Sequence, residues 1–199
     1  MSDTREHILN VSFDLFLRKS FKEVTLKEIV EKTGMSKGAF YHYFVSKEQL
    51  FMVLIDKIIS TLFVDYSKFS KDSLYQFYHD YITYSNTSGS SFQPNRSDVE
   101  DDYGRNYYLL IFDALRLYPD FQEKLFKSEQ DELKAWKEIV HTARNKGEIK
   151  SPMSDEHISN LFIYSTDGVG IRNILKGRSE DSASTLLALW DSFYEELKT

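Results

Sequence analysis

Apolar side chains recur every three or four residues along nearly the whole chain, which is the spacing of helices with one buried face. No segment alternates apolar and polar residues as a half-buried strand does. Capping residues and glycines divide the pattern into separate segments. The pattern therefore predicts an all-α fold of about nine helices. The predicted helices span 3–17, 25–33, 37–43, 46 to 63 or 66, 70–85, 98 or 104 to 117, 119–146, 154–176 and 181–197, with a polar loop at 86–97.

Closely spaced capping signals mark the segment from residue 25 to residue 50. The runs Thr25–Glu28 and Ser46–Gln49 both fit the capping box, in which a hydroxyl and a later Glu or Gln satisfy free N–H groups. Between them, Ser36 caps a short predicted helix that follows a turn at Gly34. Two short helices around a glycine turn have the spacing of a helix-turn-helix, a DNA-binding motif. The same spacing also fits a plain capped helical hairpin.

The second helix of this motif presents small and polar side chains outward if Ile29 and Phe40 face the core. Small residues near its N-terminus allow close approach to a duplex, and Tyr and His side chains bind phosphates, sugars and thymine methyl groups. The helix starts near Thr25 and Lys47 offer free N–H groups and a cation to phosphates. The outward positions of the second helix are Lys37, Gly38, Ala39, Tyr41, His42 and Tyr43.

The composition is that of a globular protein, with 41% hydrophobic and 28% charged residues. The absence of cysteine excludes disulfides, thiol catalysis and thiolate metal sites. The start of the chain lacks the apolar stretch of a signal peptide, so we expect a soluble cytoplasmic protein without a membrane partner. The net charge is −6, yet the first 55 residues hold 8 basic and 7 acidic side chains. DNA binding would therefore depend on a few well-placed cations and not on bulk charge.

Residues 4–50 closely resemble the N-terminal domain of the TetR (tetracycline repressor) family of bacterial transcriptional regulators. The resemblance rests on Ile8, Phe13 and Phe16 and on the runs Thr25–Val30, Thr33–Phe44 and Ser46–Leu50. It implies a helix-turn-helix domain at 1–50 and a helical domain for effector binding and dimerisation at 51–199. It also implies a DNA-facing surface formed by Thr25, Lys27, Ser36, Lys37, Gly38, Tyr41, His42, Tyr43 and Lys47. One departure is Val45, where the family often has a polar or basic residue.

The mechanism implied by the resemblance is that of a ligand-responsive regulator, in most members a repressor. Two subunits present two recognition helices to a palindromic operator in double-stranded DNA, at successive major grooves. A small-molecule effector then favours a conformation that no longer fits the operator. We expect no cofactor and no metal, because the chain lacks cysteine and its histidines lack ligand spacing.

Two features suggest that the last two predicted helices form a homodimer interface. Both carry broad apolar stripes, and a two-fold protein matches a palindromic operator. The alternative for these residues is a hairpin buried within one chain. The predicted interface residues are Leu161, Ser165, Gly168, Val169, Leu186, Trp190, Phe193 and Leu197.

Aromatic residues gather in the predicted effector domain. At helical spacing most aromatic side chains belong to a core, but an excess of Tyr suggests a lined, partly polar cavity, because buried hydroxyls need partners. The candidate pocket residues are Phe63, Tyr66, Tyr78, Tyr81, Tyr107, Tyr108, Phe112, Trp136 and Phe162. A cationic ligand could pair with nearby acids, which are Asp80, Asp101, Asp102 and Asp113.

Other classes of function find less support. The five His are scattered without metal-ligand spacing, and Gly168-Val169-Gly170 lacks the third glycine and the preceding strand of a dinucleotide site. We therefore expect no enzyme. The alternative to a DNA-binding regulator is a helical module that binds small molecules or proteins without sequence-specific DNA binding. Such a module has no reason to surround a capped helix with cations and tyrosines.

Overall fold

The structure is a computed structural model that describes residues 3–62, 64–88, 103–176 and 182–198. Most of the predicted 86–97 loop therefore lies outside the described residues, as do Phe63, Asp101 and Asp102. The chain divides into two compact units. The first holds α1 to α4, α6 and the start of α7, and the second holds α5, the rest of α7, α8 and α9.

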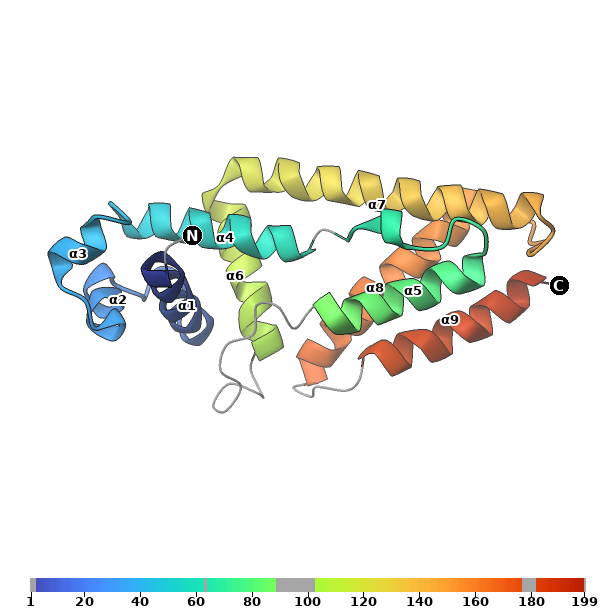
Figure 1. Cartoon of the computed structure of the whole chain (residues 1–199). Helices are drawn as coiled ribbons and strands as arrows, with labels where there is room; N and C mark the ends of the chain where they lie inside the picture. The colour runs from blue at the N-terminus through green and yellow to red at the C-terminus, as the bar shows by residue number, and fades with distance from the viewer. Residues whose placement is uncertain (1–2, 63, 89–102, 177–181, 199) are drawn as a thin grey trace. The chain divides into compact units, whose positions relative to one another are not determined.

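The predicted all-α fold is confirmed, because the described residues form helices and no strand (Figure 1). None of the helices in these ranges is both long enough and apolar enough to span a membrane. The elements are α1 (Asp3–Arg18), α2 (Leu26–Thr33), α3 (Lys37–Tyr41), α4 (Lys47–Leu62), the 3-10 helix η1 (Tyr66–Lys68), α5 (Leu74–Ser88), α6 (Tyr103–Leu117), α7 (Pro119–Asn145), α8 (Asp155–Lys176) and α9 (Ser182–Lys198).

α3 ends two residues earlier than the sequence pattern predicts. The N–H of Tyr43 donates to the carbonyl of Phe40 at 2.9 Å, so the last turn tightens after Tyr41. This turn brings Phe44 into the core, where it is 1% exposed. Burial of an aromatic ring therefore decides where the helix stops.

The first unit is built around a cluster of three phenylalanine rings. The ring of Phe51 on α4 lies 5.0 Å from Phe16 on α1 and 4.6 Å from Phe21 in the following turn. α6 packs on α1 and α4 and is tied to them by polar contacts. A carboxylate oxygen of Asp113 accepts from the N–H of Phe21 at 3.1 Å, and the hydroxyl of Tyr118 donates to the carbonyl of Glu48 at 3.1 Å.

The second unit has an aromatic core. α9 packs against both α5 and α8, as Figure 1 shows for these helices. The rings of Trp136 and Phe162 stack 4.8 Å apart, and Trp190 packs edge-on against both. The indole N–H of Trp190 donates to Ser165 at 2.8 Å, which satisfies this buried polar group.

One half-buried carboxylate, that of Glu148, joins three parts of the second unit. Glu148, in the turn after α7, accepts from the N–H groups of Leu74 and Tyr75 at the start of α5. It also accepts from the hydroxyls of Ser73 and Tyr194, the latter on α9. An acidic group at a helix start satisfies free N–H groups and complements the helix dipole.

Candidate DNA-binding surface

Local capping fixes the two short helices of the helix-turn-helix. Thr25 and Ser36 are the N-caps of α2 and α3, and their hydroxyls accept from the N–H groups of Glu28 and Ala39 at 3.1 and 3.2 Å. Gly34 ends α2 with φ 68°, a left-handed conformation in which other residues are strained. The sequence signals for both caps and for the turn are confirmed.

α3 buries one side chain and exposes the others. Phe40 is fully buried beneath it, whereas Lys37, Gly38, Ala39, Tyr41 and His42 are exposed. The ammonium of Lys37 lies 5.9 Å from the centre of the Tyr41 ring, which holds the cation over an aromatic face. A Cβ added at Gly38 would meet nothing within 4 Å, so the protein itself does not require glycine there. This helix presents a compact face of small, aromatic and cationic groups to solvent.

Lys47 has partners within the first unit that the sequence did not reveal. Its ammonium donates to the carbonyls of Phe21 and Val24, both at 2.8 Å, and lies 4.3 Å from the centre of the Phe21 ring. Lys47 therefore holds the turn after α1 against the start of α4. The two bonds occupy most of the donor capacity that the sequence assigned to a DNA phosphate.

The other predicted DNA contacts lie at the edges of α3. Thr25 and Lys27 are exposed on α2, and Lys27 lies 3.6 Å from Glu31. Tyr43 is half-buried beside His42, with the two rings 5.2 Å apart. These positions share the first unit with α3, and their contact with DNA stays a prediction.

The predicted pocket aromatics do not form one group. Five of them pack together in the core of the second unit, whereas Tyr108 and Phe112 lie on α6 in the first unit. Phe63 and the side chain of Tyr107 lie outside the described residues. The five core aromatics are Tyr66, Tyr78, Tyr81, Trp136 and Phe162.

Carboxylates satisfy two of the tyrosine hydroxyls in this core. Tyr66 donates to Glu132 at 2.9 Å, and Tyr78 donates to Asp191 at 2.6 Å. Burial raises the pKa of both hydroxyls, and the adjacent carboxylates raise it further. The expectation that buried tyrosines need polar partners is met by acids that the sequence analysis did not select.

Part of the predicted dimer surface needs correction. The side chains of Leu186, Trp190 and Leu197 are nearly fully buried in the core of their own unit, because α9 turns this stripe toward α5 and α8. They are therefore not at the surface of the unit. Leu161 and Gly168 are exposed, whereas Ser165, Val169 and Phe193 are half-buried.

An exposed apolar row runs along α8 instead. Tyr164 and Leu175 are 64% and 81% exposed, and Leu161 and Ile171 are about half exposed. Together with Gly168 these residues repeat at intervals of three and four, which places them on one face of the helix. The sequence analysis selected Leu161 and Gly168 of this face but missed Tyr164, Ile171 and Leu175, because apolar residues occur on both sides of α8.

A hollow of about 410 Å³ between α1 and α6 is a second feature that the sequence did not reveal. The buried Phe16 and Leu110 and the exposed Phe112 line it. Arg18 and Arg116 also line it. The predicted pocket residue Phe112 thus lines a surface depression of the first unit.

Comparison with known proteins relates the first unit to bacterial regulators. Residues 8–54 match the model of bacterial regulatory proteins of the tetR family. An uncharacterised HTH-type transcriptional regulator of Bacillus subtilis, YerO, is 44% identical over 52 residues, or 26% of this chain. The HTH-type transcriptional repressor NemR of Escherichia coli is 38% identical over 55 residues, or 28% of this chain. The aligned segments cover only 18% and 28% of these two relatives' own lengths.

Solved structures match almost the whole chain at low identity. Reduced NemR of E. coli superposes with a TM-score of 0.62 and 18% identity, covering 96% of this chain and 97% of that chain. A complex of SmeT with triclosan gives 0.62 and 17%, covering 94% and 88%. The relatives named here are regulators, in agreement with the expectation that this protein is not an enzyme. Residues 8–54 therefore resemble bacterial regulatory proteins of the tetR family, and almost the whole chain shares its helical fold with solved regulators such as NemR.

Proposed function

We propose that this protein is a ligand-responsive transcriptional repressor that binds a palindromic operator as a homodimer. The observation that carries the proposal is the exposed face of α3, which is capped at Ser36 and anchored by the buried Phe40. Lys37 and Tyr41 on this face provide a cation and a hydroxyl for phosphates and base edges. The name of the relative NemR as a repressor supports the direction of regulation.

The exposed row on α8 supports the homodimer. It consists of Leu161, Tyr164, Gly168, Ile171 and Leu175. Large apolar side chains left in water along one helical face favour burial against a partner surface. Their alternating spacing of three and four is that of a helix-to-helix seam, and in a two-fold dimer the same row of a second copy fits against it. A dimer also provides the two recognition helices that a palindrome requires.

The proposed function includes release of DNA when a small molecule binds. The second unit has an aromatic core that carries polar groups, and one fold neighbour, SmeT, was solved with triclosan bound. An effector that binds the DNA-free conformation more tightly lowers operator affinity by the same factor by which DNA lowers effector affinity. The usual size of such coupling is about 1–3 kcal/mol.

The test is selection of bound duplexes from a random DNA pool by the full chain, at two salt concentrations. We expect one palindrome to be enriched, with affinity that falls steeply as salt rises, because lysine contacts release counterions from phosphates. Half-sites should lie one helical turn apart, about 34–36 Å between centres. Failure of folded, ligand-free protein to enrich any sequence would favour the helical binding module without DNA specificity.

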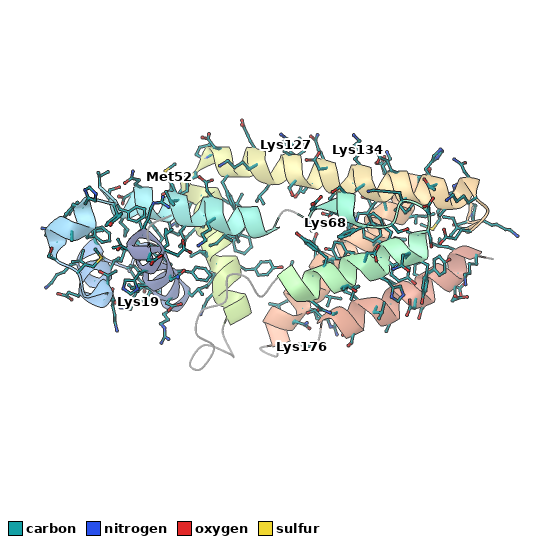
Figure 2. All side chains as sticks on the ribbon, viewed as in Figure 1. Lys19, Met52, Lys68, Lys127, Lys134 and Lys176 are labelled. Carbon is teal, nitrogen blue, oxygen red and sulfur yellow. The ribbon has the colours of Figure 1, made fainter. Side chains whose placement is uncertain are left out.

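A double variant tests whether operator binding depends on the exposed face of α3. Lys37→Ala with Tyr41→Ala removes two exposed side chains, so we expect an unchanged melting temperature and loss of operator binding. The matched control, Lys134→Ala, removes an exposed cation from α7, which Figure 2 shows pointing away from the second unit. Retention of operator binding by the α3 variant would show that the recognition surface lies elsewhere.

A further inference from the structure

The hollow between α1 and α6 lies wholly within the first unit, where these two helices pack against each other (Figure 1). The residues that line it come from the end of α1, from the turn that follows and from α6. On α6, Leu109, Asp113 and Arg116 recur at intervals of four and three residues, which places them on one side of the helix. The volume of about 410 Å³ is within the usual range of small-molecule sites, about 300–1,000 Å³.

The wall of the hollow holds large apolar side chains that are left in water. Leu109 and Phe112 of α6 are 55% and 59% exposed. The buried ring of Phe16 on α1 lines the same hollow. Exposed apolar side chains gathered in one concave surface favour an apolar ligand. Two phenylalanine rings favour an aromatic ligand, because paired rings gain more than the burial of their area.

Both acidic side chains of the hollow already have donors within the first unit. Asp113 accepts from the N–H of Phe21 at 3.1 Å and from the guanidinium of Arg116 at 3.2 Å. Glu23 accepts from the N–H and the hydroxyl of Ser20, both at 2.9 Å, and these bonds lower the pKa of Glu23. Bonds within the chain thus already use these two carboxylates.

Three cations face these two acids in the hollow, so its lining has an excess of one positive charge. The cations are Arg18, Lys19 and Arg116. Arg18 is exposed, and within the described ranges its guanidinium has no hydrogen-bond or ion-pair partner, although the charge of Asp14 acts on it from one helical turn away. Arg116 gives one of its five N–H groups to Asp113. Guanidinium groups bind carboxylates through strong, directed hydrogen bonds.

We propose that this hollow binds a small aromatic carboxylate, whose ring packs on Phe16 and Phe112 and whose charge is bound by Arg18 and Arg116. The inference goes beyond the proposed function, because the site lies in the unit that holds α3 and not in the aromatic core of the second unit. An uncharged ligand would leave the two arginines without an anion. An inorganic anion would leave the apolar wall in water.

Contacts within the first unit connect the hollow to the helix-turn-helix. Asp113 accepts from the N–H of Phe21, and the carbonyl of Phe21 accepts from Lys47 at the start of α4. Lys19 forms an ion pair with Glu28 of α2 at 2.6 Å. A ligand carboxylate would compete with Asp113 and Glu28 for their cations and so weaken the contacts that support α2 and the turn after α1. We therefore expect the ligand to lower operator affinity, and this part of the inference rests on the proposed function.

The test compares two probes of nearly the same shape against the full chain without DNA. Naphthalene-2-carboxylate is charged, and naphthalene-2-carboxamide is its uncharged analogue. Isothermal calorimetry measures the dissociation constant of each probe. We expect the carboxylate to bind at least about tenfold more tightly, because hydrogen bonds between two charged groups are stronger than neutral ones. Equal affinities, or binding of neither probe, would overturn the inference.

Variants of the lining residues locate the binding site. Arg18→Gln and Arg116→Gln remove positive charge, so each should reduce the preference for the carboxylate. Phe112→Ser should weaken both probes by a similar factor, because it removes apolar surface that both would cover. Lys22→Gln is the matched control, since Lys22 is exposed in the same turn after α1 but does not line the hollow. A preference that neither arginine variant changes would also overturn the inference.

Operator binding separates this inference from the proposed function. If the protein selects a palindrome but binds the two probes equally, the regulator stands and the carboxylate site is wrong. If the carboxylate is preferred through Arg116 but no DNA is selected, the site stands and the proposed regulator is wrong. A loss of operator affinity of at least about fivefold with bound carboxylate, absent in Arg116→Gln, supports both. Operator affinity that the bound carboxylate leaves unchanged would refute the coupling to the helix-turn-helix.

Discussion

Two glycines of the helix-turn-helix have opposite structural requirements. Gly34 has φ 68°, so the fold needs glycine at that position. Gly38 has no such constraint, and a side chain there would enter open space. A residue that the fold does not require, on the exposed face of a short helix, is best explained by close approach of another molecule.

We expect Gly38→Ala to raise the free energy of unfolding by about 0.5–1 kcal/mol, since alanine favours helix over glycine. Gly38→Leu should fold as well but weaken operator binding at least about tenfold, because its side chain would separate α3 from the duplex. Gly34→Ala should instead lower stability by about 1 kcal/mol. Denaturant unfolding and fluorescence anisotropy on the selected operator measure both effects. Unchanged DNA affinity in Gly38→Leu would contradict close approach at this position.

Glu148 gives the second unit a pH-dependent stability. Burial disfavours its ionised form, but the N–H groups of Tyr75 and Leu74 and the hydroxyls of Tyr194 and Ser73 outweigh burial and lower the pKa of Glu148. A carboxyl whose pKa is lower in the folded state stabilises the fold above its unfolded pKa. This contribution disappears as the pH falls through the folded pKa.

Glu148→Gln should therefore lower stability at pH 7 by about 2 kcal/mol, the scale of a lost helix cap. The difference from the wild type should shrink as the pH falls below about 4. Thermal unfolding followed by circular dichroism at pH 7 and pH 3.5 measures it. Glu138→Gln serves as the exposed control on α7. A destabilisation that does not vary with pH would mean that ionisation of Glu148 is not its cause.

At the scale of elements, the helix-turn-helix is held by contacts that cross its boundaries. Lys47 at the start of α4 binds the turn that follows α1, and Asp113 on α6 accepts from Phe21 in the same turn. The sequence analysis predicted α4 and its cap, and it predicted that Lys47 contacts a DNA phosphate. It did not predict the contact of Lys47 with the turn after α1. The distance of 26 residues between Phe21 and Lys47 explains why periodicity could not detect their contact.

Replacement of Lys47 by Met keeps the aliphatic stem and removes the donors. We expect a loss of about 2 kcal/mol in unfolding free energy, because charged hydrogen bonds to two carbonyls are lost. Lys37→Met, on the exposed face of α3, should change stability by no more than about 0.5 kcal/mol. Urea unfolding of both variants measures these changes in unfolding free energy. Full stability of Lys47→Met with loss of DNA binding would instead support the prediction that Lys47 binds a phosphate.

At the scale of the whole molecule, the proposed function requires two copies. The exposed row on α8 is the surface that we assign to the partner, with Ile171 near its centre. A charge buried without a counter-charge in an apolar interface is strongly unfavourable. Ile171→Glu should thus shift the protein to a monomer in sedimentation and abolish binding to the palindrome.

The control is Phe126→Glu, which places the same charge on a similarly exposed apolar residue of α7. We expect this variant to remain dimeric. Dissociation by both substitutions, or by neither, would contradict the α8 row as the interface.

The sequence by itself determined the helices, their caps and the helix-turn-helix, because periodicity, capping hydroxyls and the turn at Gly34 act within a few residues. It could not determine which polar groups meet, since Tyr66 and Glu132 lie 66 residues apart. Nor could it identify the exposed side of α8, where apolar residues occupy both faces. The packing of α9 determines which side of α8 is buried, because Trp190 packs against Phe162. Tyr164 and Leu175 on the other side remain exposed. Only the tertiary structure decides such pairings, because burial depends on which helices pack together.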